Sequence, residues 1–426
     1  MAALGGCYTP PSAAPLTAAE VASWSAGHVA PRAPGDAPAS WDLDVDAGIA
    51  YALRNGPIVS ERRDLEAVAE AEIGAAGQLT NPELRIGRTS LDSLAGSTDR
   101  VSVGLRIRPD MPWARSAKVA AARAELGAER ARTGVAQRDS AAQIRRLYAS
   151  LAFGEATRDV IGKQLVVLAE RQRVLAAQVA RATATQLEAL LADEDLLDLE
   201  TTQNTLDVEL TRTRSELAEL IGIPHGQVWK PVWDLAKLRV VETSFDRSAL
   251  TARALAARPE LAEAAHVVQA ADALAYRERA RRMPWFEYFQ VERSVRSTVD
   301  WAVSLGISIP ILSLNGGEIE AADARSHGAI TARRRLATAT LQELDAAIAL
   351  AETTGKRSRE LTARVEPLDQ AMTQLVAQSA GVADPVKLLL LEERHVRAER
   401  KVLEAAYEHR LALIALEALT GGSTWR

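Results

Sequence analysis

Residues 101–108 read Val101-Ser102-Val103-Gly104-Leu105-Arg106-Ile107-Arg108, with an apolar residue at every second position. In an extended chain this places the apolar side chains on one face and the others on the opposite face. The alternation returns about 200 residues later, where Val299, Trp301, Val303, Leu305 and Ile307 alternate with Asp300, Ala302, Ser304, Gly306 and Ser308. Each stretch predicts a β-strand, which fits either a tilted bilayer crossing or a half-buried strand of a soluble protein.

Each of these stretches precedes a long segment of helical character. Residues 113–181 contain no proline, and a helix of that span would be on the order of 100 Å long. Within it, Ile161, Leu165 and Leu168 have coiled-coil spacing with charged residues between them. Residues 317–380 form the second long segment, which only Pro367 and a few glycines interrupt. Two helices that pack lengthwise against neighbours are therefore predicted.

Several landmarks recur at one offset of about 200 residues, which predicts a twofold internal repeat. The matching positions are Pro57 and Pro259, Pro82 and Pro284, Pro109 and Pro310, and Gly222 and Gly421. The first two prolines of each half are 25 residues apart in both halves. Each half is expected to run helix, strand, strand, long helix, helix.

The expected organisation begins with a Pro/Ala-rich tether at 1–40 and ends with a tail at 422–426. The first repeat, 41–222, is expected to hold a helix at about 45–78, a strand pair at 82–108 and helices at 113–181 and 183–221. A connector at 223–245 leads to the second repeat, 246–421. That repeat is expected to hold a helix, a strand pair at 284–310 and helices at 317–380 and 385–420.

Composition agrees with long packed helices. The 426 residues are 47% hydrophobic but only 4% aromatic, and the net charge of −5 is mild. The absence of a basic excess argues against a nucleic-acid partner. The sequence contains no run of about 18 apolar residues, so it predicts no transmembrane helix. The six histidines show no paired metal-ligand spacing, and Glu392-Glu393-Arg394-His395 is expected on the surface of a charged helix.

In their order and spacing, four segments resemble the two-repeat pattern of TolC-like outer-membrane factors. They are Asn81-Pro82-Glu83-Leu84, residues 109–113, Pro310-Ile311-Leu312-Ser313-Leu314-Asn315-Gly316-Gly317-Glu318-Ile319, and Ala380-Gly381-Val382-Ala383-Asp384-Pro385. The resemblance covers nearly all of the chain from about Asp44 onward. It implies a mainly α protein with a small antiparallel β part. In such a fold three protomers give four strands each to a twelve-stranded outer-membrane β-barrel, continuous with a long α-helical periplasmic barrel.

The resemblance also implies a function without an active site or a cofactor. It indicates the duct of a tripartite efflux or type I secretion system, which passively conducts small molecules or ions to the exterior. The implied partners are two further copies of the chain, a periplasmic adaptor, an inner-membrane pump of the RND type and outer-membrane lipid. The rival interpretation is a soluble helical scaffold or a periplasmic adaptor; an enzyme is the weakest.

Candidate functional residues fall into three groups. Glu188, Asp384 and Lys387 are candidates for a periplasmic gate, although a solvated helix face is the plainer reading. Relatives often carry acidic residues where Lys387 stands here. Arg85, Arg106 and Arg108 are candidates for the barrel lumen or, equally, for anchors at lipid headgroups. The aromatic girdle candidates are Trp285, Phe286, Tyr288, Phe289 and Trp301, with packing at the strand–helix junction as the alternative.

The single cysteine, Cys7, lies in the segment Leu4-Gly5-Gly6-Cys7. This segment resembles the lipobox of bacterial lipoproteins, in which the cysteine is acylated. The preceding apolar region of a signal peptide is missing, so the true start is expected upstream. The alternative is an incidental N-terminal thiol.

Overall fold

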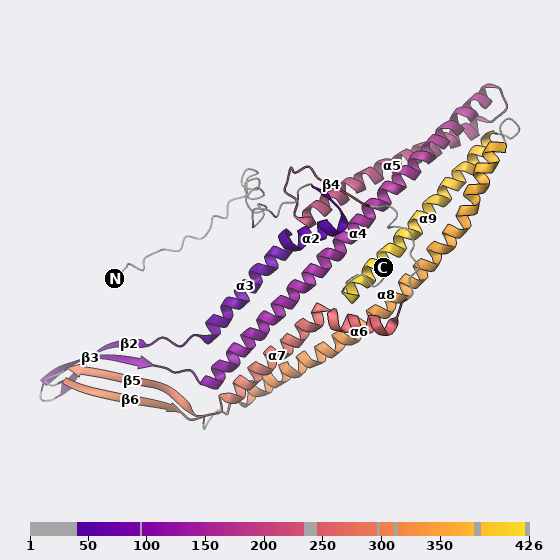
Figure 1. Ribbon diagram of the computed structural model, residues 1–426. Helices are drawn as coiled ribbons and strands as arrows, with labels where there is room; N and C mark the ends of the chain where they lie inside the picture. Colours follow the sequence, from indigo (N-terminus) through magenta and orange to yellow (C-terminus); the bar gives the residue numbers. More distant parts are fainter. Residues whose placement is uncertain are drawn as a thin grey trace. The chain divides into compact units, whose positions relative to one another are not determined.

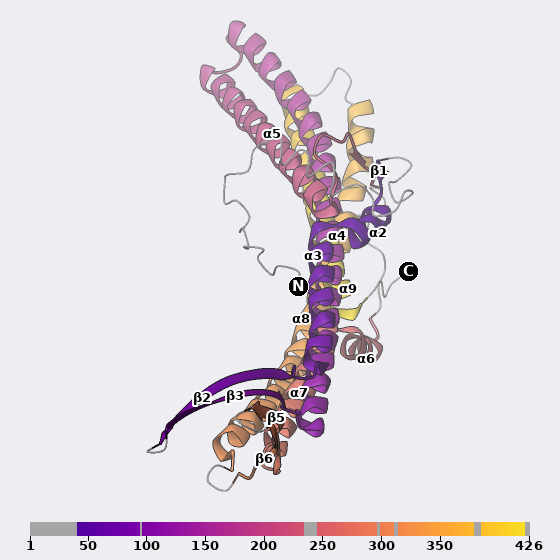
Figure 2. The same cartoon turned by 90° about the vertical axis from the view of Figure 1, so that its left-hand side faces the viewer.

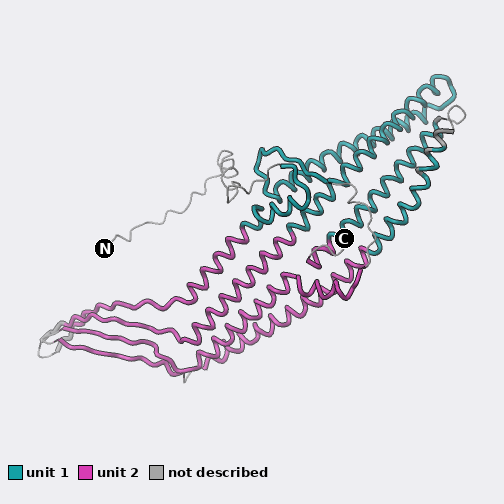
Figure 3. The backbone as a smooth tube through the Cα atoms, viewed as in Figure 1, with its two compact units in different colours: residues 1–60, 140–241, 352–414 teal, residues 61–139, 242–351, 415–426 magenta. Residues whose placement is uncertain are grey.

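The computed structural model describes residues 41–93, 96–233, 245–295, 299–310, 314–378 and 385–421. The chain is mainly α-helical with a small antiparallel sheet, which confirms the predicted fold class at that level (Figure 1). It divides into two compact units, coloured separately in Figure 3. Unit 1 comprises 1–60, 140–241 and 352–414, and unit 2 comprises 61–139, 242–351 and 415–426.

The order of elements is the same in both halves of the sequence. The first half contains β1 (Asp42–Leu43), α2 (Val45–Asn55), α3 (Pro57–Gly77), β2 (Glu83–Ser93), β3 (Gly96–Ile107), α4 (Pro112–Ala180) and α5 (Gln186–Ile221). The second contains β4 (Lys230–Pro231), α6 (Arg247–Ala257), α7 (Pro259–Ala280), β5 (Trp285–Val295), β6 (Val299–Ser308), α8 (Gly316–Gln378) and α9 (Pro385–Thr420). Among the described residues, no helix combines the length and apolar character needed to cross a bilayer.

The leading segment of the first half was expected to be one helix at about 45–78, and that expectation is wrong. The structure has two helices, α2 and α3, separated at Gly56. Gly56 is extended, with ψ of 141°, because the proline that follows it disfavours helical backbone at the preceding residue. Its N–H donates to the carbonyl of Ala52 at 2.7 Å, which closes α2. Pro367, by contrast, lies inside α8 and does not end it.

Unit 2 holds the four-stranded sheet and the helix segments that adjoin it. Its helices lie side by side in the order α3, α4, α7, α8, which matches the strand order β2-β3-β5-β6 (Figure 1). Arg115 donates to the carbonyl of Gly77 between α4 and α3. Gly127 of α4 lets the ring of His266 on α7 approach its backbone closely. A polar contact between Asp272 and Ser326 joins α7 to α8.

Unit 1 contains two helical hairpins, α4 with α5 and α8 with α9. In Figure 2 α5 runs back along α4. The main core of the unit packs α2 and β1 against α4 and α5, around Ile144, Tyr148 and Leu217. The Tyr148 hydroxyl donates to the carbonyl of Leu43 at 2.8 Å, and burial raises the pKa of this phenol. A second cluster of Ile161, Leu168 and Leu199 continues the α4–α5 contact.

Candidate functional site

The four-stranded sheet is antiparallel throughout, and its register separates two chemically different faces. Cross-strand pairing puts Leu84, Leu105, Val291 and Val303 in one row of the first face. Leu84 and Val303 are each 68% exposed. Leu105, Phe289 and Leu305 are also exposed on this face. A row of exposed aliphatic and aromatic side chains is unusual for a surface in contact with water.

The opposite face is polar and holds two of the three predicted lumen arginines close together. Arg106 Nε donates to Gln290 Oε1 at 2.9 Å, and Arg85 Nη1 donates to the same oxygen at 3.4 Å. The Arg106 guanidinium also lies 4.2 Å from the centre of the Tyr288 ring. That ring packs over Gly306, where a Cβ atom would lie 2.4 Å from it. Gln290 also donates from Nε2 to Glu292 Oε2 at 2.9 Å, so the polar face holds a cluster of two arginines and one carboxylate joined by Gln290.

Arg108 does not join this pair. Its Nε lies 3.6 Å from Glu83 Oε1, and both side chains are about half exposed. An exposed ion pair of this kind contributes little to stability. Of the three predicted lumen residues, the structure thus brings Arg85 and Arg106 together and leaves Arg108 apart.

The five aromatic candidates occupy different environments. Phe286, Phe289 and Trp301 lie on the apolar face by register, whereas Tyr288 lies on the polar face. Trp285 is at the junction between β5 and α4, where its ring meets Trp113 edge-on at 4.9 Å. Its indole N–H donates to the carbonyl of Pro109 at 2.7 Å. Trp285 therefore matches the strand–helix packing that was the alternative interpretation.

Among the gate candidates, Glu188 caps the first hairpin. It lies in the first turn of α5, where its carboxylate accepts hydrogen bonds from the N–H and the hydroxyl of Thr185, both at 2.8 Å. The Thr185 hydroxyl in turn accepts from the Glu188 N–H, which completes a capping box. The backbone hydrogen bond, followed by that of the hydroxyl, lowers the pKa of Glu188. Glu188 is exposed, and its lowered pKa keeps the carboxylate ionised at neutral pH.

The other gate candidates lie at or near the second hairpin. Lys387 is exposed in the first turn of α9. Asp384 precedes α9 and lies outside the described residues, as does Cys7. Within the described part of the chain, no three His, Cys, Asp or Glu side chains gather as a metal site would require.

A salt-bridge cluster between the hairpins was not predicted from the sequence. Arg171 on α4 lies 3.2 Å from Asp195 on α5 and 3.1 Å from Glu393 on α9. Glu393 is only 4% exposed, so its expected surface position is wrong. Its burial follows from packing of α9 against α4, since Phe153 stacks on Tyr407 with ring centres 4.5 Å apart. Three of the four residues from Glu392 to His395 are charged, and such a pattern does not indicate that one of them is buried against α4.

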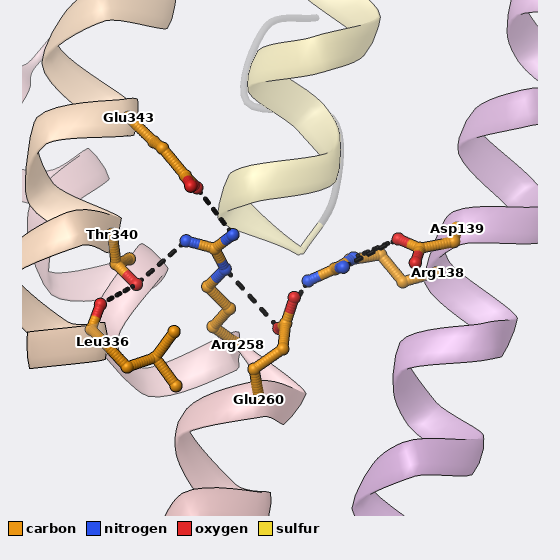
Figure 4. A network of polar contacts seen from close by, with 7 residues as sticks. All are labelled: Arg138, Asp139, Arg258, Glu260, Leu336, Thr340 and Glu343. Carbon is orange, nitrogen blue, oxygen red and sulfur yellow. Dashed lines mark hydrogen bonds and ion pairs between the residues drawn. The ribbon is translucent and has the colours of Figure 1, made fainter. Parts of the chain in front are cut away.

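A second polar network joins three helices of unit 2 (Figure 4). Arg258, at the α6–α7 junction, donates to Thr340 Oγ1 at 2.9 Å and to Glu343 Oε2 at 2.7 Å, both on α8. Its Nε also lies 3.5 Å from Glu260 Oε2. Glu260 in turn accepts from Arg138 of α4 at 2.6 Å. Burial, the largest influence, raises the pKa of Glu260, but the hydrogen bond from Arg138, a backbone hydrogen bond and the charges of Arg138 and Arg258 together lower it.

The fold thus consists of long helices interrupted twice by strand pairs, which form one two-faced sheet. The predicted resemblance to the TolC-like channels is confirmed as a likeness of fold by three solved structures. CusC is 17% identical, with 90% of this chain and 94% of that chain covered and a TM-score of 0.73. The MtrE outer-membrane channel of Neisseria gonorrhoeae, in its open state, is 19% identical, with 89% of each chain covered and a TM-score of 0.71. The outer-membrane protein VceC from Vibrio cholerae is 18% identical, with 89% and 97% covered and a TM-score of 0.70.

No protein-family model and no curated protein sequence matches the chain. The likeness therefore rests on the arrangement of helices and strands, which is retained where fewer than one residue in five is identical. It describes the fold alone. The function of a chain with this fold depends on its own side chains.

Proposed function

We propose that the chain is one protomer of a trimeric outer-membrane duct that conducts small molecules or ions. The observation that carries this proposal is the exposed apolar face of the four-stranded sheet, with Leu84, Ile86, Trp301 and Val303 each at least 68% exposed. In water such a face would drive aggregation, whereas in a bilayer it meets hydrocarbon. The polar face carrying Arg85 and Arg106 would then line the lumen.

The sheet cannot serve this role as a single copy. Four strands are too few to close a barrel, and β2 and β6 lie at the two edges of the described sheet. Unpaired strand edges are not tolerated in lipid, because their N–H and C=O groups have no partner there. Three copies, each joining its β6 to the β2 of the next, would close a barrel of about twelve strands. The helices of unit 2 would continue the wall on the side away from the strand hairpins.

The duct performs no covalent chemistry in this proposal. It conducts passively and receives its cargo from a periplasmic adaptor and an inner-membrane pump, for which we propose the RND class. Acylation of Cys7 would anchor the chain in the inner leaflet of the outer membrane. The Pro/Ala-rich residues 1–40 would then serve as a tether.

Opening of the duct would require the helical hairpins of unit 1 to separate. The contacts that oppose this separation within one protomer include the Phe153–Tyr407 stack and two ion pairs between α4 and α9, Arg171–Glu393 at 3.1 Å and Lys163–Glu399 at 3.5 Å. The side chains of Arg171 and Glu393 are 16% and 5% exposed. This low exposure makes their pair costly to break without a compensating contact. Glu188, Asp384 and Lys387 are proposed to line the entrance near the hairpin ends.

One experiment separates the duct from a soluble scaffold. Expressed behind a signal sequence, the chain should fractionate with the outer membrane, run as a trimer in mild detergent and conduct ions in planar bilayers. A Val303→Arg variant places a charge on the apolar face and should reduce insertion, since such a charge costs about 2–4 kcal/mol near the bilayer centre. Ser304→Arg, on the opposite face, is the matched control and should insert normally. Recovery of the wild type as a soluble monomer or dimer would overturn the proposal.

A further inference from the structure

Two arginines interrupt the apolar face of the sheet, and both lie toward its hairpin end. The register pairs Arg88 with Val101, which is itself paired with Val295. One row nearer the helices, Arg293 pairs with Val103 and Trp301. Successive rows on one face are about 7 Å apart along the strands, so the two arginines lie at neighbouring depths. Both are exposed.

From these two rows to the helical end, the same face carries apolar side chains in every paired row. The next row holds Leu84, Leu105, Val291 and Val303, followed by Ile107, Phe289 and Leu305, and then by Phe286 and Ile307. The three rows extend the apolar band by about 20 Å. The cations are therefore confined to one end of the face.

A charged side chain on a lipid-facing strand is strongly unfavourable at the bilayer centre and nearly neutral at the interface. Arg293 shows the geometry of an interfacial residue, since its guanidinium lies 5.8 Å from the ring centre of Trp301. Trp301 is 68% exposed. Tryptophan side chains favour the level of the lipid headgroups. The face of the indole ring also attracts a nearby cation. The pair thus marks the level at which the apolar band meets polar headgroups.

The direction of the chain assigns this level to one leaflet. All four strands are connected to helices at the end of the sheet opposite the strand hairpins. If those helices are periplasmic, as the proposed function on which this inference rests requires, the hairpin end faces outward. The lipid there belongs to the outer leaflet, which in Gram-negative bacteria consists of phosphorylated glycolipid.

We propose that Arg88 and Arg293 bind the phosphate groups of outer-leaflet glycolipid. Guanidinium groups donate two parallel N–H···O bonds to phosphate, which lysine cannot reproduce. Ile86 and Val103, with Leu84 and Leu105 one row nearer the helices, contact the acyl chains of the same lipid. The surface therefore combines an apolar band with cationic groups at one edge, as a phosphorylated lipid requires.

The test uses the full-length trimer in mild detergent, titrated with lipid A and followed by native mass spectrometry. The wild type should bind lipid A at least tenfold more tightly than its dephosphorylated form. The Arg88→Gln/Arg293→Gln variant should lose at least tenfold in affinity for lipid A. Arg100→Gln is the matched control, because Arg100 pairs with Thr89, next to Arg88, and lies on the polar face, where it donates to Ser294 Oγ at 2.6 Å; the affinity of this variant for lipid A should be unchanged.

Several outcomes would overturn the inference. One is equal binding of the two lipid forms by an intact wild-type trimer, a comparison that needs no variant to fold. Another is an intact double variant with wild-type affinity for lipid A. Displacement of lipid A by millimolar inorganic phosphate would assign the arginines to free phosphate instead. Failure of the wild type to insert or to form a trimer would be a distinct result, because it would overturn the proposed function and this inference with it.

Discussion

Removal of the Arg258 guanidinium group should loosen the helices of unit 2 by a predictable amount. Arg258 is 10% exposed and contacts Thr340, Glu343 and Glu260 at 2.9, 2.7 and 3.5 Å. In Arg258→Met the aliphatic volume is largely kept, so the change isolates the guanidinium contacts. The local opening free energy of the α7–α8 contact should fall while the rest of the fold is retained.

The three contacts have unequal weight. Glu343 is 54% exposed, so its ion pair contributes about 0–1 kcal/mol. Thr340 is fully buried and would lose a charged donor, which costs about 1–2 kcal/mol. Glu260 keeps Arg138 as a partner, so the loss there is about 0.5 kcal/mol. The mid-range values sum to about 2.5 kcal/mol, and a loss of about 2–3 kcal/mol is equivalent to opening about 30–150 times more often.

Hydrogen–deuterium exchange of the full-length trimer measures this opening without assuming two-state unfolding of the whole chain. Amides of α8 around Thr340 and of the first turns of α7 should exchange about 30–150 times faster in Arg258→Met. Glu343→Gln is the matched control and should accelerate the same amides by about fivefold at most. A change below threefold in Arg258→Met would refute the reasoning. So would a uniform increase that extended through the α4–α5 hairpin, since the loss would then be global.

Three further predictions concern other sites. Because the folded pKa of Glu260 is lowered, its stabilisation is complete above the ordinary carboxylate pKa of about 4.3 and is lost as the pH falls through the lowered value. The difference in urea midpoint between the wild type and Glu260→Gln should therefore shrink from pH 6 toward pH 3, and a constant difference would contradict this. Gly56→Ala should destabilise by about 1–3 kcal/mol in urea unfolding, because a Cβ would lie 2.4 Å from a backbone carbonyl oxygen of α2. Gly74→Ala, with no atom within 4 Å of its added Cβ, should be neutral or stabilise by about 0.5–1 kcal/mol. Glu188→Gln should lower, and Lys387→Gln raise, cation selectivity in planar bilayers; unchanged conductance and selectivity in both would eliminate these residues as gate candidates.

Local patterns in the sequence predicted most of the secondary structure. Alternation over 101–108 predicted a strand because side chains of an extended chain alternate between faces, and β3 spans Gly96–Ile107. The proline-free run after it predicted a long helix, and α4 spans Pro112–Ala180. The break between α2 and α3 was missed. Proline is compatible with the first turn of a helix, so Gly56-Pro57 alone did not distinguish one helix from two.

Local patterns in the sequence predicted the surroundings of the candidate site residues less well. Arg85 and Arg106 were selected for their strand face, and the structure adds that Gln290 joins them. Trp285 was grouped with the other aromatics of its segment, yet it packs on Trp113 at the start of α4. Its partner is far away in sequence, so no local spacing indicated it.

What the sequence determined by itself is the alternation of strand pairs and long helices, because strand and helix periodicity are properties of neighbouring residues. The tertiary structure alone decided which charged residues are buried. Glu393 lies in a charged helix segment and is nevertheless 4% exposed, because Arg171, 222 residues away, pairs with it in addition to Arg397 of its own helix. Arg258 and Gly56 occupy matching positions before the repeated prolines, but Arg258 joins α7 to α8 whereas Gly56 closes α2. Burial and charge pairing depend on residues far apart in sequence, and only the fold brings them together.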